Sequence, residues 1–415
     1  MPYTGTVTNS LELRTATDDD YPELETLISR AFLDDPDDDT SGHFRKVFEP
    51  DRTQVVADDG VLVGTGGVLT RDLTVPGAVI PAAHVTGVAV ASTHRRRGVL
   101  TSVMNAMLTE SRQRGTEPVA VLWASEGAIY GRFGYGLASW RVSYQIPTRG
   151  TALPGDVPDG VRLRHAVSAE AIADLRAVYD RVLAQRPGLS SRPGPWWDYL
   201  TADPKSWRRG MTAERSVFYE DDGGVRGYAR YRTKSGWNST GPDGEVSVTE
   251  IVAETPEAYA GLWRFLLSID LVRTVRYGQA AVDDPLTHLV TNPDGLDGTK
   301  GGALWIRVLD VPGALTARRY AAPVDLVLDV SDSTFGENAG RWRLVGDSAA
   351  ASCERTDAEP DLALDIRQLG SLYLGGVSAG TLAAGGLITE LTSGAVAAAS
   401  AAFGWHRAPS TVEIF

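Results

Sequence analysis

Apolar and polar positions change their period several times along the chain, and each period predicts one kind of element. After a short strand-like segment at 11–14, apolar residues in 21–33 recur every three or four positions, which is typical of an amphipathic helix. Segments 54–57 and 61–69 are predicted to be strands around the turn Asp58-Asp59-Gly60, and a further apolar run ends at Val90. The beginning of the chain is therefore predicted to be a helix followed by an antiparallel meander.

A helix and a strand follow the meander. Apolar residues share one face of a predicted helix at 98–112, and the all-apolar segment 119–124 is predicted to be a strand. Segment 147–160 is rich in Pro, Gly and Asp, which is typical of a linker. We therefore place a first domain of mixed helices and strands at 1–147.

The next region repeats this order of elements. A helix is predicted at 168–182, a strand pair at 216–232, a strand at 245–253 and a helix to about 269. When the segment from Val85 is laid over the segment from Val248, Gly98 meets Gly261. The same alignment replaces the arginines Arg95, Arg96 and Arg97 by Ala258, Tyr259 and Ala260. A duplicated domain that has lost its basic residues is therefore expected at 148–305.

The last region has a different pattern. Segment 324–330 alternates as a strand does, segments 341–345 and 362–366 are further predicted strands, and two or three helices of small residues are predicted within 367–403. We expect a separate α+β domain at 306–415. The fold class predicted for the whole chain is α+β (mixed α/β).

Composition narrows the possible partners. The net charge of −13 argues against sequence-independent nucleic-acid binding, which needs a basic surface, and favours cationic partners. The single cysteine, Cys353, cannot form an intramolecular disulfide, and the histidines show no ligand spacing, so no metal site is predicted. The N-terminus lacks the features of a signal peptide, and no apolar run reaches about 18 residues. We expect a cytoplasmic protein without a membrane partner.

The run from His94 to Gly98 is the strongest chemical signal. It lies between an apolar strand and an amphipathic helix, where unpaired N–H groups at the helix start could wrap a pyrophosphate that the arginines neutralise. The alternative is a solvated basic turn or a basic nucleic-acid patch. The strand-turn-helix context, and the loss of the arginines in the duplicate, favour a phosphate site.

These residues resemble a known motif. Arg95-x-x-Gly98-x-Leu100, after an apolar strand, is similar to motif A of the GNAT acetyltransferases, although Leu100 replaces the usual small residue. The resemblance implies acetyl-CoA as co-substrate, with its pantetheine arm on strand residues Val88, Ala89 and Val90. It implies pyrophosphate contacts from Arg95, Arg96, Arg97, Gly98, Val99, Leu100 and Thr101.

The second signal is the run 125–136, which contains Tyr130 and Tyr135. In GNAT enzymes a tyrosine of this arm protonates the leaving thiolate, and a phenol is protonated at neutral pH. The resemblance favours Tyr130 as the acid and Tyr135 as a packing residue, while the alternative is that both only pack. Ser125 is either an implied contact of the acetyl-CoA arm or the cap of the following helix.

The whole chain resembles the Eis (enhanced intracellular survival) family of aminoglycoside acetyltransferases, through the segments 93–100, 123–136 and 365–376 and the terminal Phe. The resemblance implies tandem GNAT domains, a sterol-carrier-like third domain and a homohexamer. It implies that the C-terminal carboxylate, here of Phe415, is the catalytic base. From the residues alone, the apolar C-terminus is predicted to be an ordered strand with a packing role.

The expected substrates are primary amines of polycationic small molecules. Asp34 and Asp35 in an acidic loop, with Phe44 and Glu413, are the candidate substrate-binding residues, although the acidic run is also typical of a solvated loop. Trp196 and Trp197 are expected to pack the second domain, and the alternative is a substrate-facing role. A protein lysine acetyltransferase and a non-catalytic acyl-CoA or lipid binder are the alternatives.

Overall fold

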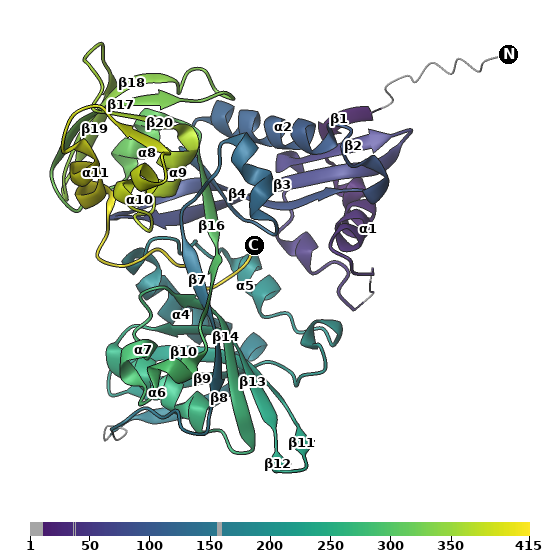
Figure 1. Cartoon of the computed structure of the whole chain (residues 1–415). Helices are drawn as coiled ribbons and strands as arrows, with labels where there is room; N and C mark the ends of the chain where they lie inside the picture. Colours follow the sequence, from purple (N-terminus) through teal and green to yellow (C-terminus); the bar gives the residue numbers. More distant parts are fainter. Residues whose placement is uncertain (1–10, 36, 38, 156–159) are drawn as a thin grey trace.

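The computed structural model describes residues 11–35, 37, 39–155 and 160–415, which form three lobes (Figure 1). The acidic residue Asp38, part of the expected linker at 156–159 and the first ten residues lie outside the described residues. The helices and strands follow the predicted order closely through the first lobe, where the periodic patterns are longest.

The first lobe is built on a seven-stranded sheet in the order β1-β2-β3-β4-β5-β16-β6. Its strands are β1 (Leu11–Thr15), β2 (Thr53–Asp58), β3 (Val61–Val75), β4 (Ala78–Val90), β5 (Val119–Trp123), β6 (Gly136–Leu137) and β16 (Leu304–Val308). Helices α1 (Tyr21–Ala31) and α2 (Val99–Arg114) cover the sheet, and α3 (Gly127–Tyr130) follows β5. Val103, Met104 and Met107 of α2 are buried, because they lie on the apolar face that the sequence pattern predicts.

The second lobe repeats this plan in a sheet of the order β15-β7-β14-β13-β10-β9-β8. Its strands are β7 (Trp140–Pro147), β8 (Arg162–Val167), β9 (Arg215–Asp221), β10 (Gly224–Lys234), β13 (Gly244–Ala253), β14 (Val272–Ala281) and β15 (Thr299–Gly302). Its helices are α4 (Ile172–Val182), α5 (Gly194–Leu200), α6 (Pro256–Ser268) and α7 (Leu286–Leu289), and β11 (Trp237–Asn238) and β12 (Gly241–Pro242) form a separate hairpin. Trp196 and Trp197 are buried, as expected.

The third lobe has a five-stranded sheet in the order β19-β18-β17-β20-β21. Its strands are β17 (Val324–Ser331), β18 (Gly340–Gly346), β19 (Ala351–Arg355), β20 (Leu362–Asp365) and β21 (Ile388–Glu390). Its helices are α8 (Val311–Ala317), α9 (Ile366–Leu372), α10 (Ala379–Ala384) and α11 (Ala395–Phe403). Two tandem lobes of one topology and a distinct third one agree with the predicted fold class.

The duplication is visible in how the central strands diverge. β4 pairs with β5 in parallel only at Ala83 and His84, although β4 continues to Val90. β13 pairs with β14 in parallel as far as Val248, which the sequence alignment places opposite Val85, and then continues to Ala253. Each lobe therefore has an open wedge at the same point of its sheet.

The first two sheets exchange strands across the domain boundaries expected near 147 and 305. β7, which precedes the first boundary, pairs with β14 and β15 in the second sheet. β16, which spans the second boundary, pairs with β5 and β6 in the first sheet. The first sheet is therefore completed by a strand that comes about 180 residues after β5.

The C-terminal prediction needs a correction. Residues 411–415 are ordered but form no strand, and the yellow chain in Figure 1 runs from α11 to an end between the first two lobes. Side chains fix this tail, which we define as residues 407–415, and its neighbours in the sheets are already paired to other strands. The apolar alternation is therefore no evidence for a strand here, since Thr411 and Glu413 are buried in the tail while Ile414 is exposed.

Candidate active site

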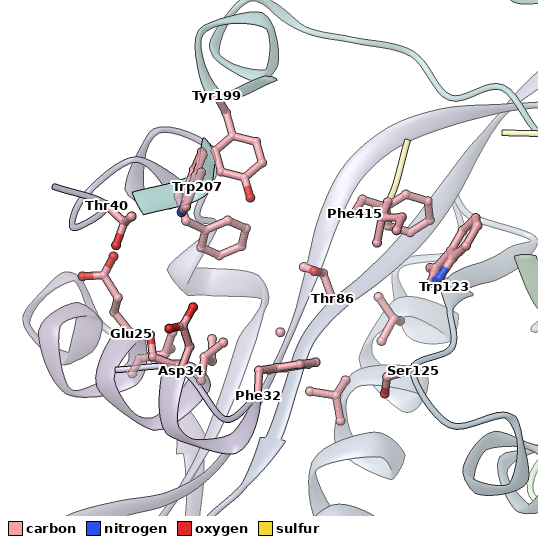
Figure 2. Close-up of a pocket in the computed structure, with 18 of the residues that line it drawn as sticks. Glu25, Phe32, Asp34, Thr40, Thr86, Trp123, Ser125, Tyr199, Trp207 and Phe415 are labelled. Carbon is pink, nitrogen blue, oxygen red and sulfur yellow. The ribbon is translucent and has the colours of Figure 1, made fainter. Parts of the chain in front are cut away.

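A cavity of about 390 Å³ opens where β4 and β5 diverge in the first lobe. Figure 2 shows Glu25, Asp34 and Thr40 on one side of it and Phe415, Trp123 and Ser125 on the other, with Thr86 on the strand between them. Its walls come from α1, the loop after α1, both diverging strands, α3, the tail and the second lobe. We refer to it as the first cavity.

The start of α2 has the geometry of an anion cradle. Gly98 has a φ of +85°, a conformation that favours glycine, and as N-cap it offers no side-chain oxygen to the helix N–H groups. The N–H groups of the first helical turn, at Val99, Leu100 and Thr101, have no partner within the helix. Leu100 packs against the core cluster below, so the larger side chain is accommodated beside the turn.

The three arginines differ in their surroundings. Arg95, Arg96 and Arg97 are all exposed, and Arg96 has a φ of +64°. Arg97 donates to Asp58 at 3.3 Å, and His94 contacts the same carboxylate oxygen at 2.9 Å. His94 is thus part of the turn, as expected. Val88, Ala89 and Val90 lie on β4 beyond its pairing with β5, and Val88 lines the first cavity.

The two tyrosines of the arm occupy different places. Tyr130, at the end of α3, lines the first cavity with Ser125. Tyr135 is 1% exposed, its ring lies 6.0 Å from that of Tyr130, and its hydroxyl has no hydrogen-bond partner among the described residues. Burial, and then the charge of Glu126, raises the pKa of Tyr130, so its phenol keeps its proton. Of the two tyrosines of this arm, Tyr130 is the one that lines the cavity.

A residue of the third lobe helps to hold the segment 125–136, which carries the two tyrosines. Arg307 of β16 donates to both oxygens of Asp332 at 2.8 Å, and this pair is fully buried. A Cβ on Gly134 would lie 2.6 Å from the Arg307 guanidinium, so glycine is needed there as well as for its φ of +82°. The arm therefore rests on an ion pair that joins two lobes.

Phe415 reaches the first cavity and packs beside His84. Their ring centroids are 4.8 Å apart, and the Arg71 guanidinium lies 5.8 Å from the Phe415 ring. The His84 imidazole contacts the carbonyl of Ala82 at 2.9 Å and the hydroxyl of Ser190 at 2.8 Å. Burial and the nearby Arg71 lower the pKa of His84 to about 3, so this histidine is neutral.

Glu413 has a structural role, which corrects its assignment as a substrate ligand. Its carboxylate is buried and accepts hydrogen bonds from Arg71, from Arg192 at 2.7 Å and from the Trp196 indole at 3.2 Å. Burial alone would raise the pKa of this carboxyl, but Arg192 and Arg71 outweigh it and lower the pKa to about 2. Both oxygens are engaged inside the protein and are not available to a substrate.

The acidic loop does border the cavity. Asp34 and Asp35 are exposed and line it together with Asp37 and Phe44. Glu25 also lines it, and its carboxylate accepts bonds from the Ser41 hydroxyl at 2.8 Å and the Gly42 N–H at 3.1 Å, which ties the loop to α1.

Sequence reasoning missed several lining residues, among them Glu25, Thr86, Trp123, Tyr199 and Trp207. Tyr199 and Trp207 come from the second lobe, so no local pattern connects them with the motifs of the first. Glu25 could have been predicted as a lining residue from the sequence, because it lies one turn after Tyr21 on the helix that leads into the acidic loop.

Three family matches cover most of the chain. Residues 12–138 and 188–308 each match a family described as acetyltransferase (GNAT) domain, and residues 311–412 match the sterol carrier protein domain. In the described part of the chain, no helix is both long enough and apolar enough to cross a membrane.

Full-length relatives give a consistent picture. An uncharacterized N-acetyltransferase of Streptomyces avermitilis is 44% identical, over 87% of this chain and 88% of its own. N-acetyltransferase Eis of Mycobacterium tuberculosis is 35% identical, over 90% of this chain and 92% of its own. The crystal structure of Eis1 from Mycobacterium abscessus is similar with a TM-score of 0.83 at 32% identity, and the match covers 97% of this chain and 100% of that one.

Proposed function

The chain belongs to the Eis family of GNAT N-acetyltransferases, and from this premise we propose that it acetylates primary amines of aminoglycosides and similar polycationic small molecules at more than one position. The observation that carries the proposal is that one cavity is lined by a protonated phenol, the C-terminal residue and an acidic wall. Asp34, Asp35 and Phe44 are the proposed substrate contacts. The carboxylates of Asp34 and Asp35, in a protein of net charge −13, would concentrate a multiply charged amine.

The GNAT domains imply the use of acetyl-CoA, and the residues at the wedge fit that molecule. The uncapped start of α2, with Arg95, Arg96, Arg97 and Gly98 to Thr101, is the proposed pyrophosphate site. The β4 segment Val88 to Val90 and Ser125 are the proposed contacts of its arm. Bound there, acetyl-CoA supplies the thioester whose carbonyl carbon is attacked.

The chain's own groups handle the protons. The Phe415 carboxylate accepts a proton from the substrate ammonium, directly or through one water. The Tyr130 hydroxyl donates its proton to the leaving sulfur, and burial of this phenol favours the protonated form that donation requires. Catalysis is therefore assigned to 1–147 with the tail, while 148–305 is a degenerate copy and 306–415 a supporting sterol-carrier-like domain.

One assay tests the substrate class. The protein is incubated with acetyl-CoA and kanamycin, with a lysine peptide, or with no acceptor, and thiol release is followed. We expect fast release with kanamycin only, and mass spectrometry of the product should show more than one added acetyl group. Release with the peptide but not with kanamycin would instead establish a protein lysine acetyltransferase.

We propose that the protein assembles as a homohexamer, on the strength of its family membership. Light scattering coupled to size-exclusion chromatography should then give six times the 44.4 kDa mass of the chain. A monomeric mass at micromolar concentration would contradict this assembly.

A further inference from the structure

A second cavity, of about 330 Å³, lies in the second lobe at the place that corresponds to the first. It opens at the wedge between β13 and β14, and Ile251, Val252 and Ala253 of β13 line it. In the sequence alignment these residues stand opposite Val88, Ala89 and Val90. The duplicated lobe has therefore kept the slot that an extended ligand would use.

The slot does not fit a phosphate-bearing molecule. Helix α6 begins at Pro256, and the hydroxyl of its N-cap Thr255 accepts the N–H of Ala258 at 3.2 Å, so the helix start is capped from within. The positions of the three cradle arginines hold Ala258, Tyr259 and Ala260. A ligand of this cavity therefore has to be recognised by groups other than a phosphate cradle of the kind that acetyl-CoA uses.

The polar groups of the cavity are acceptors. Asp284 is 8% exposed, and its carboxylate accepts the Tyr259 hydroxyl at 2.5 Å and the Leu286 N–H at 2.9 Å. Among the described residues Asp284 forms no ion pair, and the buried side-chain oxygen of Gln279 has no hydrogen-bond partner. Gln279 lies at a bulge of β14, a feature that redirects side chains.

Burial raises the pKa of Asp284 and the charge of Arg186 lowers it, but Arg186 and the other charged residues of the wall form their ion pairs elsewhere or are exposed. Arg186 donates to Asp283 at 2.6 Å and to the carbonyl of Ala408 at 2.7 Å, and Arg407 is exposed at the rim. Glu254 is paired with Arg181 and Arg226. Aromatic rings of Tyr259 and Tyr277 also line the cavity, and the rest of the wall is largely apolar.

We propose that the second cavity binds a monoamine with an apolar body, at a site distinct from the one that carries out acetyl transfer. The ammonium would donate to the Asp284 carboxylate and to the Gln279 oxygen, because within the described part of the chain the former forms no ion pair and the latter has no hydrogen-bond partner. The apolar body lies along Ile251 to Ala253 and against Val182 and Leu289.

The tail gives this site a connection to the first cavity. Ser410 and Val412 line the second cavity, Ile414 and Phe415 line the first, and Glu413 between them is held by Arg71 and Arg192. A ligand that packs against Val412 stabilises the ordered tail, because it binds only when the tail is in place. Through the tail, a bound ligand would affect turnover only if Phe415 has its proposed role, whereas binding itself does not depend on that role.

The test uses a tertiary amine, N,N-dimethyl-2-phenylethylamine, which is cationic at neutral pH and cannot be converted to a stable amide. Calorimetric titration of the full chain should show binding, and the neutral 2-phenylethanol should bind far more weakly. Asp284→Asn keeps an acceptor for the Tyr259 hydroxyl but removes the charge, and it should weaken binding by about tenfold or more. Asp34→Asn, in the first cavity, should leave this affinity unchanged.

A second variant keeps the test decisive if Asp284→Asn unfolds. Leu289→Trp fills the cavity from a half-buried position and should abolish binding while the melting transition is retained. Wild-type affinity in Leu289→Trp, or in a folded Asp284→Asn, would overturn the proposal. Loss of binding in Asp34→Asn alone would also overturn it, because the amine would then occupy the first cavity. None of these outcomes depends on acetyl transfer.

Discussion

Glu413 connects three parts of the molecule through buried charge. It is bonded to Arg71 of β3 and to Arg192, and Arg192 also donates to Glu250 of β13 at 2.9 Å. All four side chains are almost completely buried. Removing one member of such a network leaves a buried charge without a partner. This lowers the free energy of unfolding by more than the intact pair adds to it.

Glu413→Gln should therefore destabilise the protein markedly. The amide leaves Arg71 without its neutralising charge and leaves Arg192 with Glu250 alone, and loss of one partner of a buried pair costs about 3–5 kcal/mol in the free energy of unfolding. Denaturant unfolding followed by tryptophan fluorescence measures this change. A shift within error of zero would show that the two arginines are neutralised elsewhere.

The difference between wild type and Glu413→Gln should depend on pH. The folded pKa of Glu413, about 2, is below its ordinary value of 4.5, so ionised Glu413 contributes stability that is fully present above about pH 4.5. That contribution is lost as the pH falls from 4.5 through 2. The two proteins should converge in stability at the acid end of this range.

Tyr130→Phe should lower turnover by about two to four orders of magnitude, which is typical of losing a general acid. The matched control is Tyr135→Phe, which removes a hydroxyl that bonds to none of the described residues and should therefore leave stability and turnover nearly unchanged. Steady-state thiol release with both variants makes the comparison. Equal turnover in the two variants would refute the role of Tyr130.

At the scale of elements, the clearest prediction concerns acetyl-CoA binding at the start of α2. Arg96→Ala should raise the Michaelis constant for acetyl-CoA by about tenfold to a hundredfold with little effect on that for the amine, because charge-assisted phosphate contacts contribute about 1.5–3 kcal/mol. Arg114→Ala, at the opposite end of the same helix and paired with Glu110, is the control and should change neither constant. An unchanged acetyl-CoA constant in Arg96→Ala would remove it from the pyrophosphate site.

Elements whose pattern is local could be predicted from the sequence, and those that depend on distant partners could not. The helix that begins at the cradle and the strands before it are predicted by the spacing of their apolar residues and by the turn residues between them. The duplicated lobe is indicated by the alignment of Val85 with Val248. β19 lies between polar turns and has one buried side chain, Cys353, so its alternation is too short to predict a strand. The lining residues Tyr199 and Trp207 reach the first cavity only because the second lobe packs against it.

At the scale of the whole molecule, the strand exchange makes the first lobe depend on the rest of the chain. Without β16, the sheet ends at β5, and the buried residues Leu304, Ile306 and Val308 are missing from its core. A fragment of residues 1–147 should therefore not fold cooperatively, whereas the full chain should. Circular dichroism during thermal unfolding tests this, and a sharp transition in the fragment would contradict it.

In the proposed mechanism, the position of Phe415 is the feature that depends on most of the molecule. The tail leaves α11 in the third lobe, passes the second cavity and reaches the first, so the position of Phe415 depends on all three lobes (Figure 1).

Residues appended after Phe415 would convert its carboxylate into a neutral amide, and deletion of Phe415 would move the carboxylate by about 3.3–3.6 Å of extended chain, more than proton transfer tolerates. Both changes should abolish most turnover while acetyl-CoA binding and the melting transition stay nearly intact, since Glu413 still anchors the tail. Phe415→Leu keeps the carboxylate and loses only the ring contact with His84, so its effect should be milder. These variants are compared by thiol release with kanamycin and by acetyl-CoA titration, and full activity in the extended enzyme would mean that another group or solvent takes the proton.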